Sequence, residues 1–364
     1  MKPVIHLIVA ARPNFMKIAP LYHKLKQLNL FDIVFVHTGQ HYDINMSASF
    51  LNDLSLPKPD INLGIGSGTH AEQTGYVMIS YEKVLIENPP DWIVVAGDVN
   101  STLACTVTAK KLNLKVAHLE AGLRSYDRTM PEEINRIVTD TLADVLWTPS
   151  EDADVNLRNE GIENSRIIRV GNMMIDSFEF LRNIIENQNT REHLGLHPKK
   201  YGIITLHRPS NVDSCYTLCP IISAITELAE KTKLVFPIHP RTQRMASKYD
   251  LLAKLQKNDN IVLVEPLRYV EFMNLVIQSQ FVITDSGGIQ EETTYLNIPC
   301  MTLRKNTERP ITCSQGTNRL VNYDDLNICH EEILKGKWPH GRKPDLWDGK
   351  TATRVVNSLE SLIA

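Results

Sequence analysis

Residues 4–10 read VIHLIVA, an apolar run of strand length, and the segment from Lys17 to Leu28 behind it has helical spacing, with Lys and Leu on opposite faces. An apolar strand of this kind is typical of a parallel sheet that is covered by helices on both faces. The beginning of the chain therefore predicts the first β-α unit of a parallel α/β sheet.

Similar apolar runs alternate with helix-like stretches along the whole chain. In the first half they cover residues 33–36, 92–96, 114–117 and 145–148. After a helix-like stretch from Met173 to about Glu192 the pattern restarts, with runs at 202–206, 233–237, 261–264 and 281–284. An amphipathic stretch from Thr351 to Ile363 is expected to end the chain as a helix. Two successive doubly wound domains fit this pattern better than one large sheet.

Size, charge and cysteine content narrow the class of protein. The 364 residues are enough for two domains at about 150 residues each. The net charge of −3 argues against a nucleic-acid partner, and no apolar run approaches the ~20 residues that span a bilayer. We expect a cytoplasmic protein without a membrane partner. Its six cysteines (Cys105, Cys215, Cys219, Cys300, Cys313 and Cys329) lack metal-site spacing, and we expect reduced thiols.

Polar residues directly follow the expected strands, at the place where open α/β sheets bind their ligands. Any one of these segments alone could simply cap a helix or pair on the surface, but six in register indicate a site. They are 11–17, 97–102, 118–124, 207–211, 239–241 and 285–292.

One of these segments, Asp285-Ser286-Gly287-Gly288, has the pattern of a diphosphate cradle. A helix expected to start near Ile289 would present free backbone N–H groups that no side chain obstructs. The segment is neither a Walker loop nor the GxGxxG fingerprint, so the signatures of ATP and NAD are missing. His207 and Arg309 are expected to complete this anion site.

The first half of the chain contributes carboxylates instead: Asp98, Glu120 and the pair Glu132-Glu133. Carboxylates grouped in a cleft are expected to have raised pKa values, which suit proton transfer. Glu132 and Glu133 also follow Pro131, and acids are favoured in the first turn of a helix, so a structural role is equally open. A phosphate site in one domain and an acidic site in the other indicate a nucleotide-sugar enzyme with acid/base chemistry.

Taken together, the motifs resemble those of the non-hydrolysing UDP-N-acetylglucosamine 2-epimerases of bacteria and archaea. The resemblance implies two Rossmann-like doubly wound domains in a GT-B arrangement, with the active site in the interdomain cleft. It also implies a homodimer. Two domains are expected. The first comprises residues 1–171, which carry the acid/base residues, and is joined by the helix 351–364. The second comprises residues 172–350 and binds UDP. The matching motifs lie between residues 10 and 350 and read ARPNFMKIAPL, TGQH, GDVNST, HLEAGLRS, MPEEINR, GNMMID, HRPSN, HP, TDSGGIQEE, TERP, GTN and WDGK.

The resemblance implies reversible inversion at C2 of UDP-GlcNAc to give UDP-ManNAc, without a metal or another cofactor, in the synthesis of surface polysaccharides or glycoconjugates. A base removes the C2 proton while UDP leaves C1, which gives 2-acetamidoglucal. UDP then adds back as a proton arrives on the opposite face. Loss of UDP needs a preorganised cationic site, and proton transfer on two faces needs more than one carboxyl group.

Residue roles are carried over by position. Asp98, Glu120 and Glu132 match the acidic catalytic residues, with the base and the acid left open, and Lys17 and His207 match two further catalytic residues. Glu292 is expected to hold the ribose hydroxyls, and Phe272 either flanks uracil or belongs to the core. The residues that match the binding of the UDP-sugar are Arg12, Arg136, Phe272, Ser286, Gly287, Gly288, Glu292 and Arg309.

Many bacterial members of the family need UDP-GlcNAc at a second, allosteric site. Gln40, Arg208 and His239 match positions of that site, whereas a second Gln and an Arg have no obvious counterpart here. We therefore expect weak or absent activation by UDP-GlcNAc.

Several alternatives stay open at this point. A hydrolysing relative would release ManNAc and UDP from a nearly identical site, and a UDP-diacetamido-uronic acid could replace UDP-GlcNAc as substrate. A GT-B glycosyltransferase would bind UDP without needing Asp98, Glu120 and Glu132. A nucleotide-sugar sensor would have no use for proton-transfer groups.

Overall fold

The computed structural model describes residues 2–39 and 51–363, and the chain forms two compact units. Unit 1 comprises Met1–Phe180 and Asp345–Ala364, and unit 2 comprises Leu181–Pro344. The expected domain boundaries lie at 171/172 and 350/351, whereas the units divide inside helix α7 (Met173–Glu186) and before residue 345. The first turns of α7 belong to unit 1 because they pack there: the Ser177 hydroxyl donates to the Met16 carbonyl.

The described residues of unit 1 form a sheet of seven strands in the order β3-β2-β1-β4-β5-β6-β7, and all its neighbouring strands are parallel. The central strands are buried on both faces, as their continuous apolar sequences require. The strands are β1 (Val4–Val9), β2 (Asp32–His37), β3 (Ile61–Asn62), β4 (Trp92–Ala96), β5 (Val116–Leu119), β6 (Val145–Thr148) and β7 (Ile167–Arg169).

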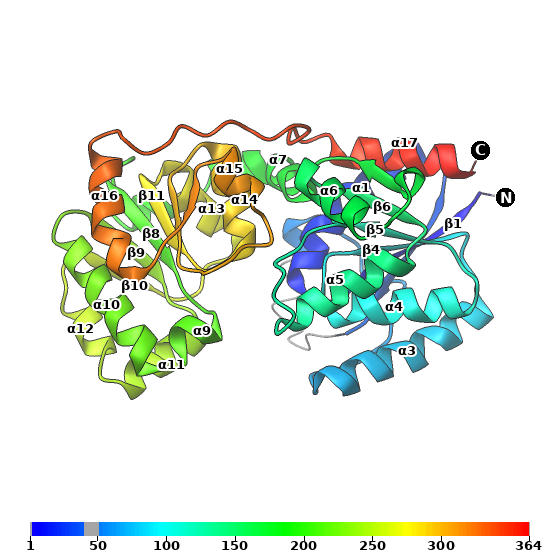
Figure 1. Ribbon diagram of the computed structural model, residues 1–364, viewed down its shortest axis with the longest axis horizontal. Coiled ribbons are helices and arrows are strands. Elements are labelled where there is room, and N and C mark those ends of the chain that lie inside the picture. Colours follow the sequence, from blue (N-terminus) through cyan, green and yellow to red (C-terminus); the bar gives the residue numbers. More distant parts are fainter. Residues whose placement is uncertain (1, 40–50, 364) are drawn as a thin grey trace. The chain divides into compact units, whose positions relative to one another are not determined.

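Helices connect these strands and cover both faces of the sheet (Figure 1). The carboxyl-terminal helix α17 (Thr351–Ile363) returns to unit 1 and packs against α1 (Arg12–Leu28). Asp176 on α7 fixes its start, because that carboxylate accepts the backbone N–H groups of Thr351 and Ala352. The other helices of unit 1 are α3 (His70–Glu87), α4 (Asn100–Lys111), α5 (Pro131–Leu142), α6 (Glu151–Asn159) and the short η1 (Asn164–Arg166).

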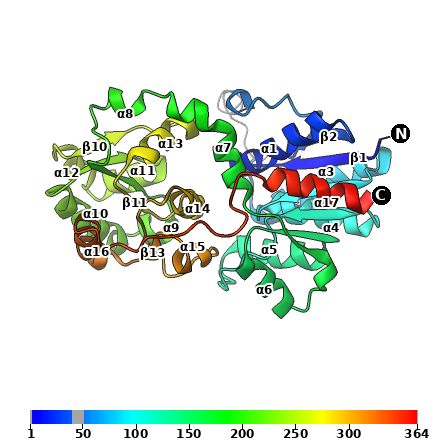
Figure 2. The ribbon, with the colours of Figure 1, turned by 90° about the horizontal axis from the view of Figure 1, so that it is seen from above.

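Unit 2 repeats the same architecture with a six-stranded parallel sheet in the order β10-β9-β8-β11-β12-β13. Helices α10 and α16 lie side by side on it (Figure 2). The strands are β8 (Tyr201–Thr205), β9 (Lys233–Pro237), β10 (Ile261–Val264), β11 (Phe281–Thr284), β12 (Cys300–Thr302) and β13 (Asn318–Leu320). The helices are α8 (Thr190–His193), α9 (Pro209–Val212), α10 (Cys215–Ala229), α11 (Pro240–Lys248), α12 (Leu252–Gln256), α13 (Tyr269–Gln278), α14 (Gly287–Leu296), α15 (Ile311–Ser314), η2 (Tyr323–Asp325) and α16 (Leu326–Leu334).

The expectation of two Rossmann-like, doubly wound domains is confirmed. One expected strand is displaced: it lies at Val116–Leu119 instead of 114–117, because the Leu114 N–H still bonds to the Ala109 carbonyl at the end of α4. The strands β3, β7, β12 and β13 were not expected, since runs of two or three residues are too short to show a pattern.

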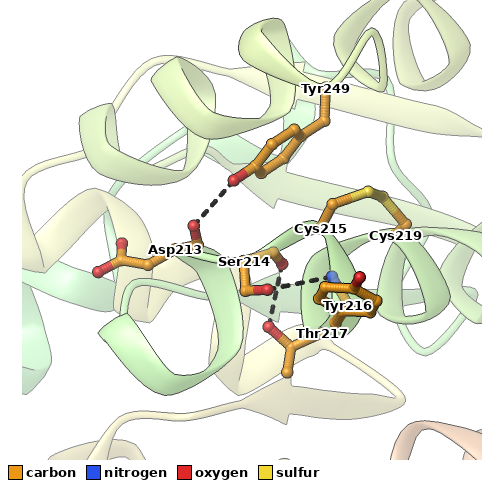
Figure 3. Close-up of a disulfide and its surroundings, with 7 residues drawn as sticks. All are labelled: Asp213, Ser214, Cys215, Tyr216, Thr217, Cys219 and Tyr249. Carbon is orange, nitrogen blue, oxygen red and sulfur yellow. Dashed lines mark hydrogen bonds between the residues drawn. A yellow bond between two sulfur atoms is a disulfide. The ribbon is translucent and has the colours of Figure 1, made fainter.

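The prediction that all six cysteines are reduced is wrong for one pair. Cys215 and Cys219 form a disulfide in the first turns of α10, with their Cα atoms 5.1 Å apart (Figure 3). Residues four apart share one face of a helix, so the two side chains can meet. The remaining four are free thiols: Cys105, Cys300 and Cys329 are buried and Cys313 is exposed.

None of the helices in the part of the chain that the structure describes is both long enough and apolar enough to cross a membrane.

Candidate active site

Unit 1 carries its candidate catalytic residues at the carboxyl ends of two neighbouring strands. Asp98 follows β4 and Glu120 follows β5, while Lys17 lies on α1. Two further residues, Glu132 and Arg136, lie on α5. Since β4 and β5 are paired in parallel, the loops that carry the two carboxylates start at the same edge of the sheet.

Lys17 forms a salt bridge with Glu120, and both side chains are almost fully buried. Glu120 has a φ of +74°, a left-handed conformation that is uncommon for a residue other than glycine and that costs energy to hold. Gly97 lies against the same ammonium group, because a Cβ there would be 2.8 Å from Lys17 Nζ. A small cavity of about 10 Å³, room for about one water molecule, is lined by Lys17, Glu120 and Asn172 among others.

A second cluster of charged side chains in unit 1 is centred on Arg136 of α5. The Arg136 guanidinium contacts the Asp98 carboxylate and donates to Glu133 Oε2 at 2.5 Å. Glu133 is buried and also accepts the backbone N–H groups of Ser125 and Tyr126. Burial alone would raise the pKa of Glu133, but the hydrogen bonds from Ser125 and Arg136 outweigh burial and lower it. The expectation of a raised pKa is therefore wrong for Glu133.

Glu132, the neighbour of Glu133, is exposed. The two neighbouring candidates at the start of α5 therefore differ in their surroundings. Glu133 accepts hydrogen bonds from the backbone at 125–126 and from Arg136, whereas Glu132 is exposed to solvent. Both remain in the first helical turn after Pro131, so the structural role foreseen for the pair applies to Glu133.

A buried ionic network that sequence reasoning missed supports this end of the sheet. His118 lies 2.6 Å from Asp140 through Nδ1 and 2.8 Å from the Gly97 carbonyl through Nε2. Asp140 also accepts Arg124 Nη1 and the Gly122 N–H. The network therefore fixes the backbone directly before Asp98 and on both sides of Glu120. The only sequence signal for it was the presence of His and Arg within HLEAGLRS.

In unit 2, His207 and Asp285 form a pair at the ends of β8 and β11. His207 Nδ1 lies 2.8 Å from Asp285 Oδ1, and the backbone N–H groups of His207 and Arg208 donate to the same carboxylate. Burial would raise the pKa of Asp285, but the hydrogen bond and charge of His207 lower it. The loop from 207 to 211 is thus tied to β11 through one buried acid, whose importance the sequence did not reveal.

The amino terminus of α14 is open in the way that the Ser-Gly-Gly sequence predicts. Ser286 precedes the helix, and a Cβ on Gly288 would lie more than 4 Å from its neighbours among the residues that the structure describes. At Gly287 a Cβ would lie 2.6 Å from Glu308 Oε1 and 2.7 Å from Arg309 Nη1, so a larger residue there would displace the ends of these two side chains. Arg309 is held by Glu291 and Glu308. Backbone N–H groups and Arg309 therefore meet at one helix end, where anions bind.

Glu292 lies one turn further along α14 and is buried. It accepts the Tyr269 hydroxyl at 2.6 Å. Burial raises the pKa of Glu292 to about 7, the Tyr269 hydrogen bond opposes that shift, and the nearby charge of Glu291 adds to it. Phe272, one turn after Tyr269 on α13, is partly exposed rather than part of the core.

The proposed allosteric residues are only partly described. His239 caps α11 and its ring centroid lies 5.7 Å from that of His207, while Arg208 Nε donates to the Asp285 carbonyl. Burial and the charge of His207 lower the pKa of His239. Gln40 lies outside the described residues, and so does the side chain of Arg12, whose backbone begins α1. Within residues 2–39 and 51–363 there is no cluster of three or more metal-ligating side chains.

These two units, each with polar groups at the carboxyl ends of parallel strands, define an α/β protein of the nucleotide-binding type. The sequence model of UDP-N-acetylglucosamine 2-epimerase matches residues 23–360. The chain is 45% identical to a UDP-N-acetylglucosamine 2-epimerase homolog of Methanococcus maripaludis, over 98% of this chain and 99% of the relative. It is 39% identical to the UDP-2,3-diacetamido-2,3-dideoxy-D-glucuronate 2-epimerase of Pseudomonas aeruginosa, over 98% of this chain and 99% of that relative.

Among solved structures, the fold resembles Methanocaldococcus jannaschii UDP-GlcNAc 2-epimerase in complex with UDP-GlcNAc and UDP. The TM-score is 0.89 at 42% identity, with 98% of this chain and 99% of that chain covered. The chain belongs to the UDP-N-acetylglucosamine 2-epimerase family. The resemblance inferred from the motifs is therefore confirmed. The family is one of epimerases, and not of glycosyltransferases or nucleotide-sugar sensors.

Proposed function

We propose that this chain catalyses the reversible, non-hydrolysing epimerisation of UDP-GlcNAc to UDP-ManNAc. The observation that supports this most is the open amino terminus of α14 beside Arg309, in a chain that also keeps an acidic group in its other unit. Such a reaction needs both a site for a departing diphosphate and more than one proton-transfer group.

Unit 2 supplies the groups that bind UDP in this proposal. The backbone N–H groups at Ser286, Gly287 and Gly288 and the Arg309 guanidinium stabilise the negative charge that grows on the diphosphate as the C1–O bond breaks. His207 donates a hydrogen bond to the same leaving group, with its ring held by Asp285. Glu292 accepts the ribose hydroxyls, and the exposed face of Phe272 contacts uracil.

Unit 1 supplies proton transfer. One carboxylate among Asp98, Glu120 and Glu132 takes the C2 proton while UDP leaves C1, which gives 2-acetamidoglucal and UDP. A second carboxyl group then protonates C2 on the opposite face as UDP returns to C1. Lys17 orients Glu120 and Arg136 orients Asp98, because each forms an ion pair with that carboxylate.

Proton NMR of the protein with UDP-GlcNAc in deuterated water tests this proposal. Deuterium at C2 together with an anomeric signal of UDP-ManNAc is the expected result, because the carboxyl group that protonates C2 takes its hydron from the deuterated solvent. Free ManNAc and UDP would instead establish a hydrolysing enzyme.

A related substrate is the second candidate. A diacetamido-glucuronate epimerase is 39% identical to this chain, so the same NMR experiment with a UDP-diacetamido-uronic acid is the matched assay. We expect turnover of UDP-GlcNAc to be the faster of the two. A homodimer and a role in polysaccharide or glycoconjugate synthesis remain predictions from the resemblance, and light scattering coupled to gel filtration tests the first. A cytoplasmic location remains a prediction from the sequence.

A further inference from the structure

Glu292 differs from the other acids around the amino-terminal half of α14, because it has no cationic partner within residues 2–39 and 51–363. Glu291 pairs with Arg309 Nε at 2.9 Å, and Glu308 pairs with Arg304 at 2.8 Å and with Arg309 at 2.5 Å. Among the described residues, Glu292 forms no ion pair, and its hydrogen-bond partner is the neutral Tyr269 phenol at 2.6 Å. A buried carboxylate without a cation is costly unless hydrogen bonds stabilise its charge.

The position of Glu292 links it to the open end of α14. Gly288 and Glu292 are four residues apart, so they lie on one face of the helix, about 6 Å apart along its axis. In the described part of the chain, a Cβ built on Gly288 would have no neighbouring atom within 4 Å. A nucleoside diphosphate whose phosphates lie at Gly288 would thus extend its sugar toward Glu292.

We propose that Tyr269 is a positioning residue, whose hydroxyl favours the ionised form of Glu292, so that this carboxylate accepts the two hydroxyls of a ribonucleoside diphosphate. This inference rests on the proposed function, because it assumes that UDP binds along α14. A protonated acid would itself be a donor and would compete with the sugar hydroxyls, whereas a carboxylate only accepts. Burial and Glu292 raise the pKa of Tyr269 well above its usual value, so its phenol remains a donor at neutral pH.

The groups that act on Glu292 set the expected pH dependence. They are the Tyr269 phenol on α13 and Glu291 on α14, whose charge is offset by Arg309. With the Glu292 pKa near 7, UDP affinity should rise as the pH rises through 7. Loss of the phenol removes the hydrogen bond that lowers this pKa. Since a hydrogen bond to a charged group is worth about one pKa unit or more, the midpoint should move to about pH 8.

The experiment measures the Kd of UDP by isothermal titration from pH 6 to pH 9.5. The proteins are the unchanged chain, Tyr269→Phe, Glu292→Gln and Tyr201→Phe. Tyr201→Phe is the matched control, because its hydroxyl also bonds to α13, at the Leu275 carbonyl, away from Glu292. Glu292→Gln records the pH dependence that comes from the UDP phosphate and the histidines alone.

The expected result is that Tyr269→Phe weakens UDP binding about ninefold at pH 6 and about threefold at pH 7.5, with no difference at pH 9.5. The unchanged chain should also prefer UDP to 2′-deoxy-UDP, and Tyr269→Phe should lose most of that preference at pH 6. A Tyr269→Phe curve that runs parallel to that of the unchanged chain, or coincides with that of Tyr201→Phe, would overturn the inference. If Glu292→Gln binds UDP as well as the unchanged chain does, the ribose site of the proposed function fails.

Discussion

Lys17 and Glu120 form a salt bridge although 103 residues separate them in the sequence. Both side chains are about nine-tenths buried, and Glu120 holds a left-handed backbone conformation beside the turn at Gly97. The two opposite charges are buried together, so a buried ion pair joins helix α1 to the loop after β5. The pair therefore links the stability of unit 1 to the position of a candidate proton-transfer group.

Lys17→Met should lower both stability and activity, because it removes the ammonium group that forms an ion pair with the buried Glu120 carboxylate. We expect a loss of about 3 kcal/mol in the free energy of unfolding and a fall in kcat of about 100-fold or more. Urea unfolding and NMR turnover measure the two effects. The control is Lys110→Met, which breaks a more exposed bridge to Asp144 and should cost less than about 1 kcal/mol with unchanged turnover. Equal losses in both variants would contradict the coupling.

The same substitution at the neighbours Glu132 and Glu133 should affect different properties: activity at Glu132 and stability at Glu133. Glu133→Gln should destabilise the protein by about 2–3 kcal/mol, because it weakens the buried hydrogen bonds that this carboxylate accepts from Arg136 and from the backbone N–H groups of Ser125 and Tyr126. Glu132→Gln should change stability by less than about 0.5 kcal/mol but reduce kcat by about 100-fold. Denaturant midpoints and turnover of both variants give the answer, and full activity of Glu132→Gln would remove Glu132 from the proton-transfer groups.

Glu292→Gln should stabilise the nucleotide-free protein above neutral pH. The folded state raises the pKa of Glu292 from 4.5 to about 7, so it binds a proton that the unfolded chain has released between these values. Stability from this group is therefore present below pH 4.5 and is lost as the pH rises through 7. The variant should gain up to about 3 kcal/mol relative to the unchanged chain at pH 8, and little at pH 4.5. Melting temperatures at both pH values test this, and a gain that is independent of pH would contradict it.

Activation by UDP-GlcNAc should be weak or absent. The prediction rests on the missing counterparts of a second Gln and an Arg, although Arg208 and His239 are kept. The initial rate from UDP-ManNAc should follow a hyperbolic curve, and traces of added UDP-GlcNAc should leave it unchanged. A sigmoidal curve that added UDP-GlcNAc abolishes would establish an allosteric activator.

The disulfide makes a prediction that mass spectrometry can test. Alkylation of the folded, unreduced protein should modify the exposed Cys313 but neither Cys215 nor Cys219, and reduction should make those two react. Because the disulfide closes a loop of only five residues, its loss should cost about 2 kcal/mol at most. The variant Cys215→Ser/Cys219→Ser is the control, since reduction should leave its melting temperature unchanged. Labelling of Cys215 before reduction would show that the pair is a dithiol.

Much of the fold could be predicted from local patterns. The strands at 92–96, 145–148, 233–237, 261–264 and 281–284 and the helix Thr351–Ile363 lie where the apolar runs and the amphipathic spacing indicated. The four shortest strands and the dividing point inside α7 could not be predicted, because partners distant in the sequence decide them.

The sequence by itself determined which polar loops lie together, since the carboxyl ends of neighbouring parallel strands meet at one edge of a sheet. It also determined the open end of α14, because glycine has no side chain that could cover the free backbone N–H groups of the first turn. Only the tertiary structure decided that Glu133 is buried while Glu132 is exposed, that Asp285 holds His207, and that Tyr269 donates to Glu292. The physical reason is that burial and pairing depend on how each helix is rotated against its neighbours, and residues far apart in the chain fix that rotation.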